Sequence, residues 1–246
     1  MENWLSGQTM IYGPERTRGQ ILPAILRRRT TAEPEALPKK SRRGDKSLST
    51  RQQLIESTIK AIAAGGLQEA TLTVVSDMSG LSRGLVGYHF RSKDQMLKET
   101  LAYLADEYRS GWEATLTDPD ASPEERLLGL IDFDLGTVVC SRSRVAVWYA
   151  FWGSVRTKQL YRDVCLPADR EYMKLIATQI KALKREEQIQ GLDADGIATG
   201  YSAMIIGQWQ QFNISPGGFH RESAKGICRA YFRGFFPGRF MRGDAA

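Results

Sequence analysis

The sequence predicts an all-α protein with an N-terminal three-helix helix-turn-helix domain and a larger C-terminal helical domain. Apolar residues recur every three or four positions in about nine segments after residue 48. No segment alternates apolar and polar residues as a half-buried strand would, and no internal repeat is present. We therefore expect an extension over residues 1–47, a helix-turn-helix domain over residues 48–95 and the helical domain over residues 96–240.

The expected extension has no sustained apolar period and contains four prolines and two basic clusters, at residues 27–29 and 39–43. Such a segment buries too little apolar surface to offset chain entropy, so we expect disorder. Residues 1–50 hold ten lysines and arginines against five aspartates and glutamates, and so carry +5 of the net charge of +6. The segment is either inert, an over-extended translation start included, or a basic arm that neutralises DNA phosphates or enters a minor groove.

The composition argues against membrane proteins and enzymes. No run of about 18 apolar residues could span a bilayer, and the N-terminus lacks the order of a signal peptide, so we expect a cytoplasmic protein with no membrane contact. The few, widely spaced cysteines and histidines leave little material for a disulfide framework, a metal site or a Ser-His-Asp triad. We expect no metal, no cofactor and no catalytic residue; the residues concerned are Cys140, Cys165, Cys228, His89 and His220.

Residues 49–93 carry the signals of three short helices followed by the start of a long one. The first helix closes at Gly65-Gly66, and either Thr71 or Thr73 can cap the second. Gly80 permits the sharp turn that a helix-turn-helix needs, and Ser82 caps the third helix. Ser92 or Lys93 then opens the long helix.

The third helix, which ends near Phe90, has an anchoring face and an outer face. Leu81, Val86 and Phe90 share one side and pack on the first two helices. The other residues lie on the outer side, where they could enter a DNA groove or simply be solvated as in an ordinary helical hairpin. They are Arg83, Gly84, Leu85, Gly87, Tyr88 and His89.

This stretch resembles the DNA-binding motif of the TetR family of transcriptional repressors. The matching residues are Thr71, Gly80, Leu81, Ser82, Gly84, Tyr88, His89, Phe90, Ser92 and Lys93. The resemblance implies that Ser82, Tyr88, His89 and Lys93 contact phosphates of a pseudo-palindromic double-stranded operator. It also implies that Arg83, Leu85 and Gly87 face the base edges, while Thr71 and Gly84 complete the DNA-binding set.

Two positions of the third helix govern its expected sequence preference. Arg83 can make a bidentate contact with guanine, worth about 1–3 kcal/mol of discrimination. Gly87 stands where the family often has a tyrosine, and it offers no side-chain contact. The operators of better-known relatives therefore do not transfer to this chain.

An aromatic stripe marks the C-terminal domain. Trp148 and Trp152 lie one helical turn apart and share a face, with Phe151 between them. The stripe either fills a core or lines a cavity that holds a quaternary ammonium ion against aromatic rings. Aromatic residues of other helices, Tyr201 included, could complete such a box. The predicted ligand-binding residues are Tyr108, Trp112, Trp148, Phe151, Trp152 and Trp209.

The segments WYAFW and DREYMKL resemble the choline-responsive repressors of glycine-betaine synthesis, a branch of the TetR family. So does LVGYHFRSKDQML in the helix-turn-helix domain of residues 48–95, which we call the reading head. The likeness covers about residues 50–235 and implies a ligand such as choline or another quaternary amine. Asp134, Asp169 and Glu171 remain equal candidates for its charge partner. The alternatives are a TetR-type regulator of amine catabolism or efflux, a helical enzyme that uses the pocket, and an architectural DNA-binding protein driven by the basic tail.

The last two predicted helices suggest a dimer interface. Small residues recur at Gly200, Ser202, Ala203 and Gly207, and apolar bulk follows at Ile227, Tyr231, Phe235 and Phe236. A two-fold homodimer presents two reading heads about 34–36 Å apart on one face of DNA. We expect a four-helix interface, as in the family, with an internal hairpin as the alternative. A ligand would change the spacing of the heads by moving the long helix that begins at Lys93.

Overall fold

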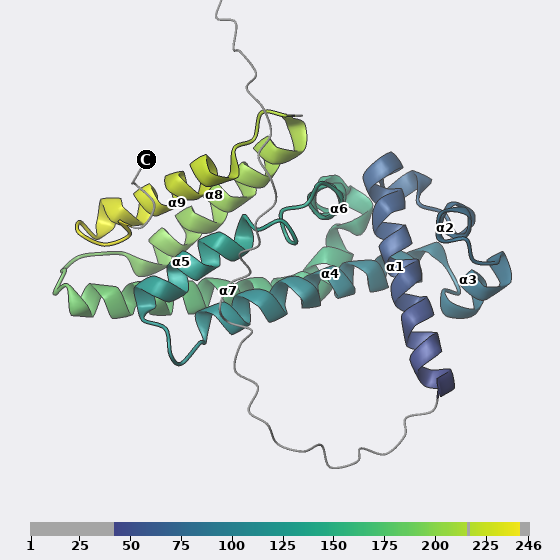
Figure 1. Cartoon of the computed structure of the whole chain (residues 1–246), viewed down its shortest axis with the longest axis horizontal. Coiled ribbons are helices and arrows are strands. Elements are labelled where there is room, and N and C mark those ends of the chain that lie inside the picture. The colour runs from purple at the N-terminus through teal and green to yellow at the C-terminus, as the bar shows by residue number, and fades with distance from the viewer. Residues whose placement is uncertain (1–41, 216, 242–246) are drawn as a thin grey trace, which may run out of the picture. The chain divides into compact units, whose positions relative to one another are not determined.

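The computed structural model describes residues 42–215 and 217–241, with side chains from residue 49 onward. Over these residues the chain forms nine α-helices, one 3₁₀ helix and no strand (Figure 1), which confirms the predicted all-α class. None of the described helices is long and apolar enough to cross a membrane. The helices are α1 (Arg42–Glu69), α2 (Leu72–Ser79), α3 (Arg83–His89), α4 (Lys93–Leu116), α5 (Pro123–Asp134), α6 (Arg142–Gly153), the 3₁₀ helix (Val155–Thr157), α7 (Lys158–Glu186), α8 (Ala194–Ile214) and α9 (Arg221–Phe235).

Helix α1 differs from its prediction at both ends. It begins at Arg42, inside the segment expected to be an extension, whose residues 1–41 lie outside the described residues. At Gly66 the backbone turns to φ 75° and ψ −179°, and a helical turn resumes as far as Glu69. Only glycine adopts this conformation without strain, so the predicted end of the helix is a kink rather than a stop.

Side-chain caps set the boundaries of the next three helices. The Thr71 hydroxyl accepts the Val74 N–H at 3.2 Å and starts α2, which resolves the choice between Thr71 and Thr73. Gly80 ends α2 in the left-handed conformation at φ 69°. Ser82 and Ser92 then cap α3 and α4 in the same way as Thr71. Each cap satisfies an N–H that has no partner within its helix.

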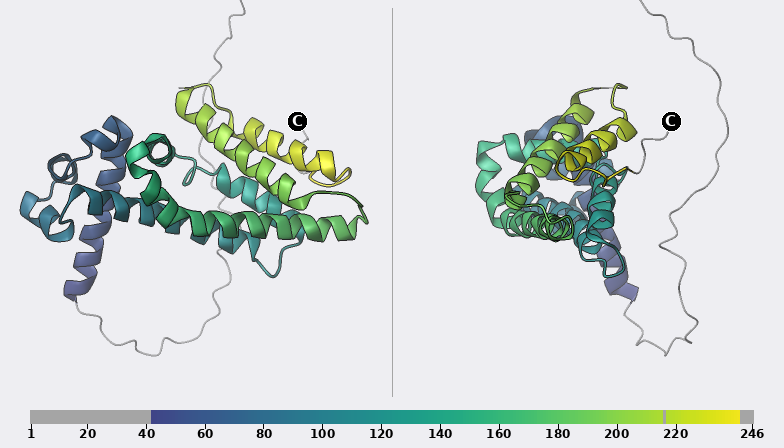
Figure 2. Two further views of the ribbon diagram at one scale, coloured as in Figure 1. Left: turned by 180° about the vertical axis from the view of Figure 1, so that it is seen from behind. Right: turned by 90° about the vertical axis from the view of Figure 1, so that its left-hand side faces the viewer.

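Helix α4 connects two groups of helices (Figures 1 and 2). Its first turns pack on α1, which also contacts α2 and α6, and its later turns pack on α5 and α7. Helix α7 in turn lies along α8, and α9 packs on α5 and α8. Helices α4 and α6 therefore both contact α1, and both also contact α7.

The apolar spacing predicts a helix over about residues 124–139, whereas α5 ends at Asp134. Tertiary contacts account for the difference, because side chains of α8 and α9 take the last carbonyl groups. Trp209 Nε1 donates to the Asp134 carbonyl at 2.8 Å, and Arg221 Nη1 donates to the Leu135 carbonyl at 2.6 Å. The chain then turns through residues 135–141 before α6.

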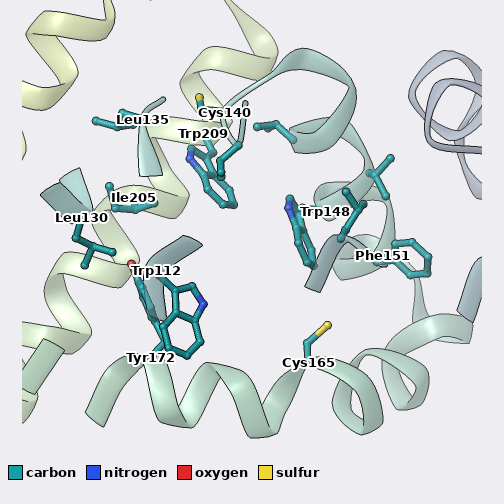
Figure 3. Packing of buried hydrophobic residues seen from close by; sticks show 14 of the residues in the cluster. Trp112, Leu130, Leu135, Cys140, Trp148, Phe151, Cys165, Tyr172, Ile205 and Trp209 are labelled. Atoms are coloured by element: carbon teal, nitrogen blue, oxygen red, sulfur yellow. The ribbon is translucent and has the colours of Figure 1, made fainter. Parts of the chain in front are cut away.

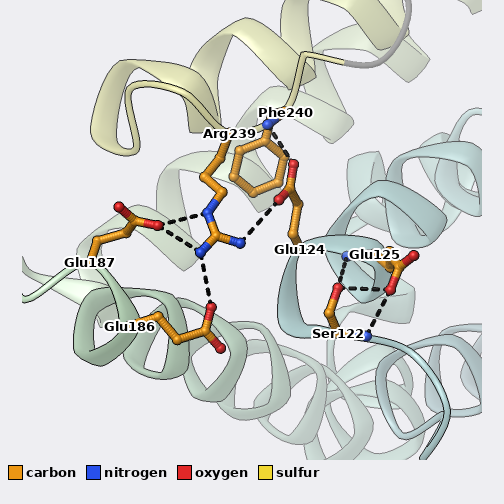
Figure 4. A network of polar contacts seen from close by, with 7 residues as sticks. All are labelled: Ser122, Glu124, Glu125, Glu186, Glu187, Arg239 and Phe240. Atoms are coloured by element: carbon orange, nitrogen blue, oxygen red, sulfur yellow. Dashed lines mark hydrogen bonds and ion pairs between the residues drawn. The ribbon is translucent and has the colours of Figure 1, made fainter.

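Ion pairs close the C-terminal end of the bundle (Figure 4). Arg239 donates to Glu187 at 2.7 Å, to Glu186 at 3.2 Å and to Glu124 at 3.3 Å, so it joins the turn after α9 to the end of α7 and the start of α5. The backbone N–H of Phe240 donates to Glu124 at 2.6 Å. The same figure shows the capping box of Ser122 and Glu125 that begins α5.

Candidate functional site

Helix α3 presents its predicted outer face to solvent. Val86 and Phe90 are fully buried on the inner side, as the anchoring pattern required. Tyr88 is 77% exposed, and its ring meets His89 edge-on at 5.3 Å. Arg83 is also exposed, whereas Leu85 and His89 are half-buried. An exposed arginine and tyrosine on a short helix that is supported from behind can contact a nucleic acid without rearrangement.

Two glycines leave this face flat. A Cβ atom added at Gly84 or Gly87 would meet nothing within 4 Å, so internal packing does not require glycine at either position. Both residues are exposed beside Arg83. The absence of side chains allows another surface to approach the backbone of α3 closely.

The remaining polar residues of the predicted DNA-binding set already have partners inside the chain. The hydroxyl groups of Thr71 and Ser82 cap α2 and α3, and Ser82 itself is exposed. Lys93 Nζ donates to the Gln68 carbonyl near the end of α1. Ser82 therefore lies at the exposed start of α3, while Thr71 and Lys93 lie at the starts of the two flanking helices.

A cavity of about 160 Å³ lies between α4, α6, α7 and α8. Four of the six predicted ligand-binding residues line it, and they are Tyr108, Trp148, Trp152 and Trp209. Figure 3 shows Trp148 and Trp209 on opposite sides of this space. The other lining residues are Tyr161, Asp169, Tyr172, Met173, Ser202, Ile205 and Ile206.

The structure places Trp112 and Phe151 outside the cavity. Both are buried in the core, and Trp112 packs edge-on against Tyr172 with ring centroids 5.6 Å apart (Figure 3). Trp112 thus supports a cavity wall from behind. Helical spacing assigned both residues to apolar faces correctly. Whether such a residue lines the cavity or packs behind its wall depends on how the helices cross.

The cavity walls are stacked and edge-on aromatic rings. Trp148 and Trp152 stack at 6.2 Å with an interplanar angle of 25°, and Tyr161 meets Trp152 edge-on at 6.2 Å. On the opposite side, Tyr108 meets Trp209 at 5.7 Å and 70°. Several aromatic faces around one small space favour a cationic, apolar guest.

The three candidate carboxylates have three different environments. Asp169 lines the cavity and accepts a hydrogen bond from Tyr161 Oη at 3.1 Å. Burial raises the pKa of Asp169, and the hydrogen bond from Tyr161 opposes this effect. Glu171 pairs with Arg109 at 3.0 Å on the partly exposed side of α7. Asp134 is fully buried behind the cavity wall.

Asp134 is the centre of a tyrosine cluster. Tyr108 donates to its Oδ1, and Tyr172 and Tyr201 donate to its Oδ2, each at 2.8 Å. Burial raises the pKa of Asp134 to about 6, although the three hydrogen bonds act in the opposite direction. Burial and the charge of Asp134 also raise the pKa of all three tyrosines, so the hydroxyls stay protonated at neutral pH. Tyr201 belongs to this cluster and does not line the cavity.

Several lining residues were not selected from the sequence. Tyr161 lies on α7 eight residues before Asp169, which was itself a candidate charge partner, and Tyr172 falls within the DREYMKL segment. Ser202, which was assigned to the dimer interface, lines the cavity with Ile205 one turn further along α8. Their spacing of three, four or eight residues indicates that they share a helix face. It does not reveal which helices meet around the cavity.

The α8–α9 pair combines internal and outward-facing small residues. A Cβ atom at Gly200 would lie 2.2 Å from Tyr231 Oη, and that hydroxyl donates to the Ile197 carbonyl at 3.0 Å. Gly200 therefore serves an internal contact, as the hairpin interpretation expected. Gly207 has open space around it, and Ile227 is exposed. At Gly207 and Ile227 the outward side of the α8–α9 pair is therefore not covered by other parts of the described chain.

Comparison with known proteins gives consistent matches. Residues 123–237 match the family model described as the C-terminal domain of the BetI-type transcriptional repressor. The HTH-type transcriptional regulator BetI of Yersinia pestis (strain Pestoides F) is 29% identical over 183 residues, which are 74% of this chain and 89% of the relative. BetI of Escherichia coli K12 DH10B is 26% identical over 189 residues, which are 76% and 94% of the two chains.

The fold is also that of solved regulators. A regulator from Saccharomonospora viridis in complex with choline has a TM-score of 0.63 at 24% identity, over 76% of this chain and 96% of that one. These relatives are transcriptional regulators rather than enzymes. The chain is thus similar to transcriptional regulators of the TetR family, and its residues 123–237 match the BetI-type C-terminal domain.

Proposed function

We propose that this protein is a transcriptional repressor whose affinity for a pseudo-palindromic operator is controlled by a small cationic ligand, and that it regulates choline or glycine-betaine metabolism. The observation that carries the proposal is the connection between an exposed α3 and an aromatic cavity through shared helices. The similarity to BetI regulators and the choline bound by the Saccharomonospora viridis regulator support the choline assignment.

The cavity favours a monocation over a zwitterion. Its lining combines the aromatic faces of Trp148, Trp152 and Tyr161 with the Asp169 carboxylate, and the lining contains no lysine, arginine or histidine. A quaternary ammonium gains about 0.5–2 kcal/mol from each aromatic face. Glycine betaine carries the same ammonium group, but its carboxylate would have no cationic partner in the lining. Choline and betaine aldehyde are therefore the preferred ligands.

The repressor acts as a homodimer through α8 and α9. The outward surface at Ala203, Gly207 and Ile214 of α8 and Ile227 of α9 supports this assignment, because small residues let a second copy approach closely. A dimer supplies the two reading heads that a palindromic operator requires.

Control is a population shift between two spacings of the reading heads. The ligand contacts α4 and α6, and both helices pack on α1. A ligand that binds more tightly to one spacing moves the equilibrium toward it, and operator affinity then changes by the same coupling free energy. Choline favours the spacing that does not fit the operator.

Isothermal titration of the full-length protein with choline, betaine aldehyde and glycine betaine tests the proposal. We expect the first two to bind at least about tenfold more tightly than glycine betaine, because only the zwitterion carries an unpaired carboxylate into the cavity. Trp152→Ala should weaken choline binding, and Trp152→Phe should weaken it less. Binding of a different hydrophobic amine in place of choline would assign the protein to amine catabolism or efflux, and turnover of any amine would indicate an enzyme.

A further inference from the structure

Asp134 is buried behind the cavity and accepts hydrogen bonds from residues in three of its walls. Its two oxygens accept hydrogen bonds from Tyr108 of α4 and Tyr172 of α7, and its backbone carbonyl accepts one from Trp209 Nε1 of α8, each at 2.8 Å. All three donors line the cavity, whereas Asp134 does not touch it. One residue at the end of α5 thus fixes aromatic rings that come from three other helices.

The charge of Asp134 is not neutralised inside the protein. No lysine or arginine in the described part of the chain forms an ion pair with it, and its side chain is bound by hydroxyl groups alone. A buried carboxylate costs free energy even when it is fully hydrogen-bonded, and a neutral side chain of similar size would pack at lower cost. The uncompensated charge therefore indicates a role other than packing.

The tyrosine hydroxyls transmit this charge to the cavity. A phenol has one proton to donate, and Tyr108 and Tyr172 both direct it at Asp134, so their oxygens can offer only lone pairs elsewhere. Donation to a carboxylate also moves electron density into the ring, which strengthens the attraction of its face for a cation. The two rings that flank the buried carboxylate are thus more attractive to a cation than isolated tyrosines.

We infer that Asp134 is a specificity-determining residue of the ligand cavity, which selects cations through Tyr108 and Tyr172 without touching the ligand. The inference rests on the proposed function. It gives the cavity a second negative charge, that of Asp134, besides that of Asp169. Asp169 lines the cavity itself, whereas Asp134 acts from behind the lining through the hydroxyl groups of Tyr108 and Tyr172. A guest of the same shape without the positive charge would gain nothing from Asp134.

The test compares choline with its neutral carbon analogue, in which a tert-butyl group replaces the trimethylammonium group. Both are titrated calorimetrically at pH 8 into the full-length protein and its Asp134→Asn variant. We expect the variant to bind choline about tenfold more weakly and the neutral analogue within about threefold of the wild-type affinity. Asp132→Asn is the matched control on α5, because Asp132 is largely exposed and pairs with Lys225 at the surface; it should change neither affinity.

A second pair of variants keeps the inference testable if Asp134→Asn does not fold. Tyr172 and Tyr201 both donate to Asp134 Oδ2 at 2.8 Å, but only Tyr172 lines the cavity. Tyr172→Phe should lower the ratio of choline affinity to neutral-analogue affinity, and Tyr201→Phe should leave that ratio unchanged. Equal loss of both ligands in Asp134→Asn, or equal ratios in the two tyrosine variants, would overturn the inference.

The outcomes also separate this inference from the proposed function. If the wild-type protein does not bind choline, the proposed ligand class fails and the inference fails with it. If the wild-type protein binds choline and Asp134→Asn keeps the wild-type ratio of the two affinities, only the inference fails. Circular dichroism of each variant establishes that the helices are intact.

Discussion

Arg144 of α6 is joined to Glu56 of α1 by an ion pair in which Nη2 lies 3.0 Å from Oε1. The same guanidinium donates to both carboxylate oxygens of Glu107 on α4, at 2.6 and 2.8 Å. Trp148 and Trp152 follow on α6 one and two turns after Arg144, and both line the cavity. A single side chain thus connects the reading head, the long helix and the helix that carries two cavity walls.

We predict that Arg144→Gln uncouples the ligand from the operator. The glutamine lacks the charge and the bidentate geometry that hold α1, α4 and α6 together. Choline affinity and the operator affinity of the ligand-free protein should stay within about threefold of wild type, while the choline-induced drop in operator affinity falls by about tenfold. Fluorescence anisotropy with a labelled operator measures the operator affinity with and without choline, and isothermal titration measures the choline affinity.

Arg109→Gln provides the matched control for this prediction. Arg109 lies on α4 and likewise pairs with two glutamates, Glu113 and Glu171, but neither partner belongs to α1 or α6. The control should retain the full response to choline. An unchanged response in Arg144→Gln would remove Arg144 from the coupling mechanism.

The free energy of unfolding should depend on pH through Asp134. Burial raises its pKa from 3.8 to about 6, so between these values the folded chain holds a proton that the unfolded chain has lost. Stability therefore falls as pH rises through this window, by about 3 kcal/mol at about 1.4 kcal/mol per pKa unit.

Urea unfolding of wild type and Asp134→Asn at several pH values from 4 to 8 checks this expectation. Because asparagine does not titrate, the variant should gain stability relative to wild type as the pH rises, and the gain should level off above about pH 7. Asp169 is present in both proteins, so its own raised pKa cancels from the difference. Parallel stability curves would show that Asp134 does not titrate in this range.

Gly207→Arg should convert the protein to a monomer. The substitution places a long charged side chain on the outward surface of α8, where a second copy would approach. Operator binding should weaken strongly, because one reading head cannot span both half-sites, while choline binding persists. Ser110→Arg adds the same charge at an exposed position of α4 and should remain dimeric. Sedimentation analysis distinguishes the two outcomes, and a dimeric Gly207→Arg variant would place the interface elsewhere.

Arg83→Ala should remove sequence-selective DNA binding and leave the dimer intact. A lost bidentate contact with guanine corresponds to about 1–3 kcal/mol at one position of each half-site. Arg91→Ala is the control, because Arg91 is exposed just beyond the end of α3. Competition between operator and random DNA at fixed salt is the measurement, since salt alone changes the affinity of any basic protein for DNA. Equal selectivity in both variants would exclude Arg83 from base recognition.

The local structure of the reading head could be predicted because its signals are short-range. Thr71, Ser82 and Ser92 cap the helices that follow them, and Gly80 takes the left-handed conformation that the turn requires. Each depends on a few neighbouring residues, so the sequence contains the needed information. The first helix was the exception, because Gly66 kinks it without ending it.

The cavity was less predictable because it depends on how distant helices cross. The periodicity correctly assigned Trp112 and Phe151 to apolar faces, but both lie in the core rather than on the cavity wall. Asp134 and Asp169 could not be ranked as charge partners of the ligand from the sequence. Only the packing of α5 and α7 places Asp169 in the cavity wall and Asp134 behind it. The early end of α5 has the same origin, since Trp209 and Arg221 lie far along the chain from the carbonyls they bind.

The most direct test of the account is an operator titration with and without choline. An operator is first selected from randomised duplexes by the purified full-length protein, and its affinity is then measured by fluorescence anisotropy at fixed salt. The account predicts a pseudo-palindromic operator whose affinity falls at least about tenfold with saturating choline, and a smaller fall in Trp152→Ala. The account would be contradicted if choline left the operator affinity unchanged. It would also be contradicted if Trp152→Ala kept the full response to choline.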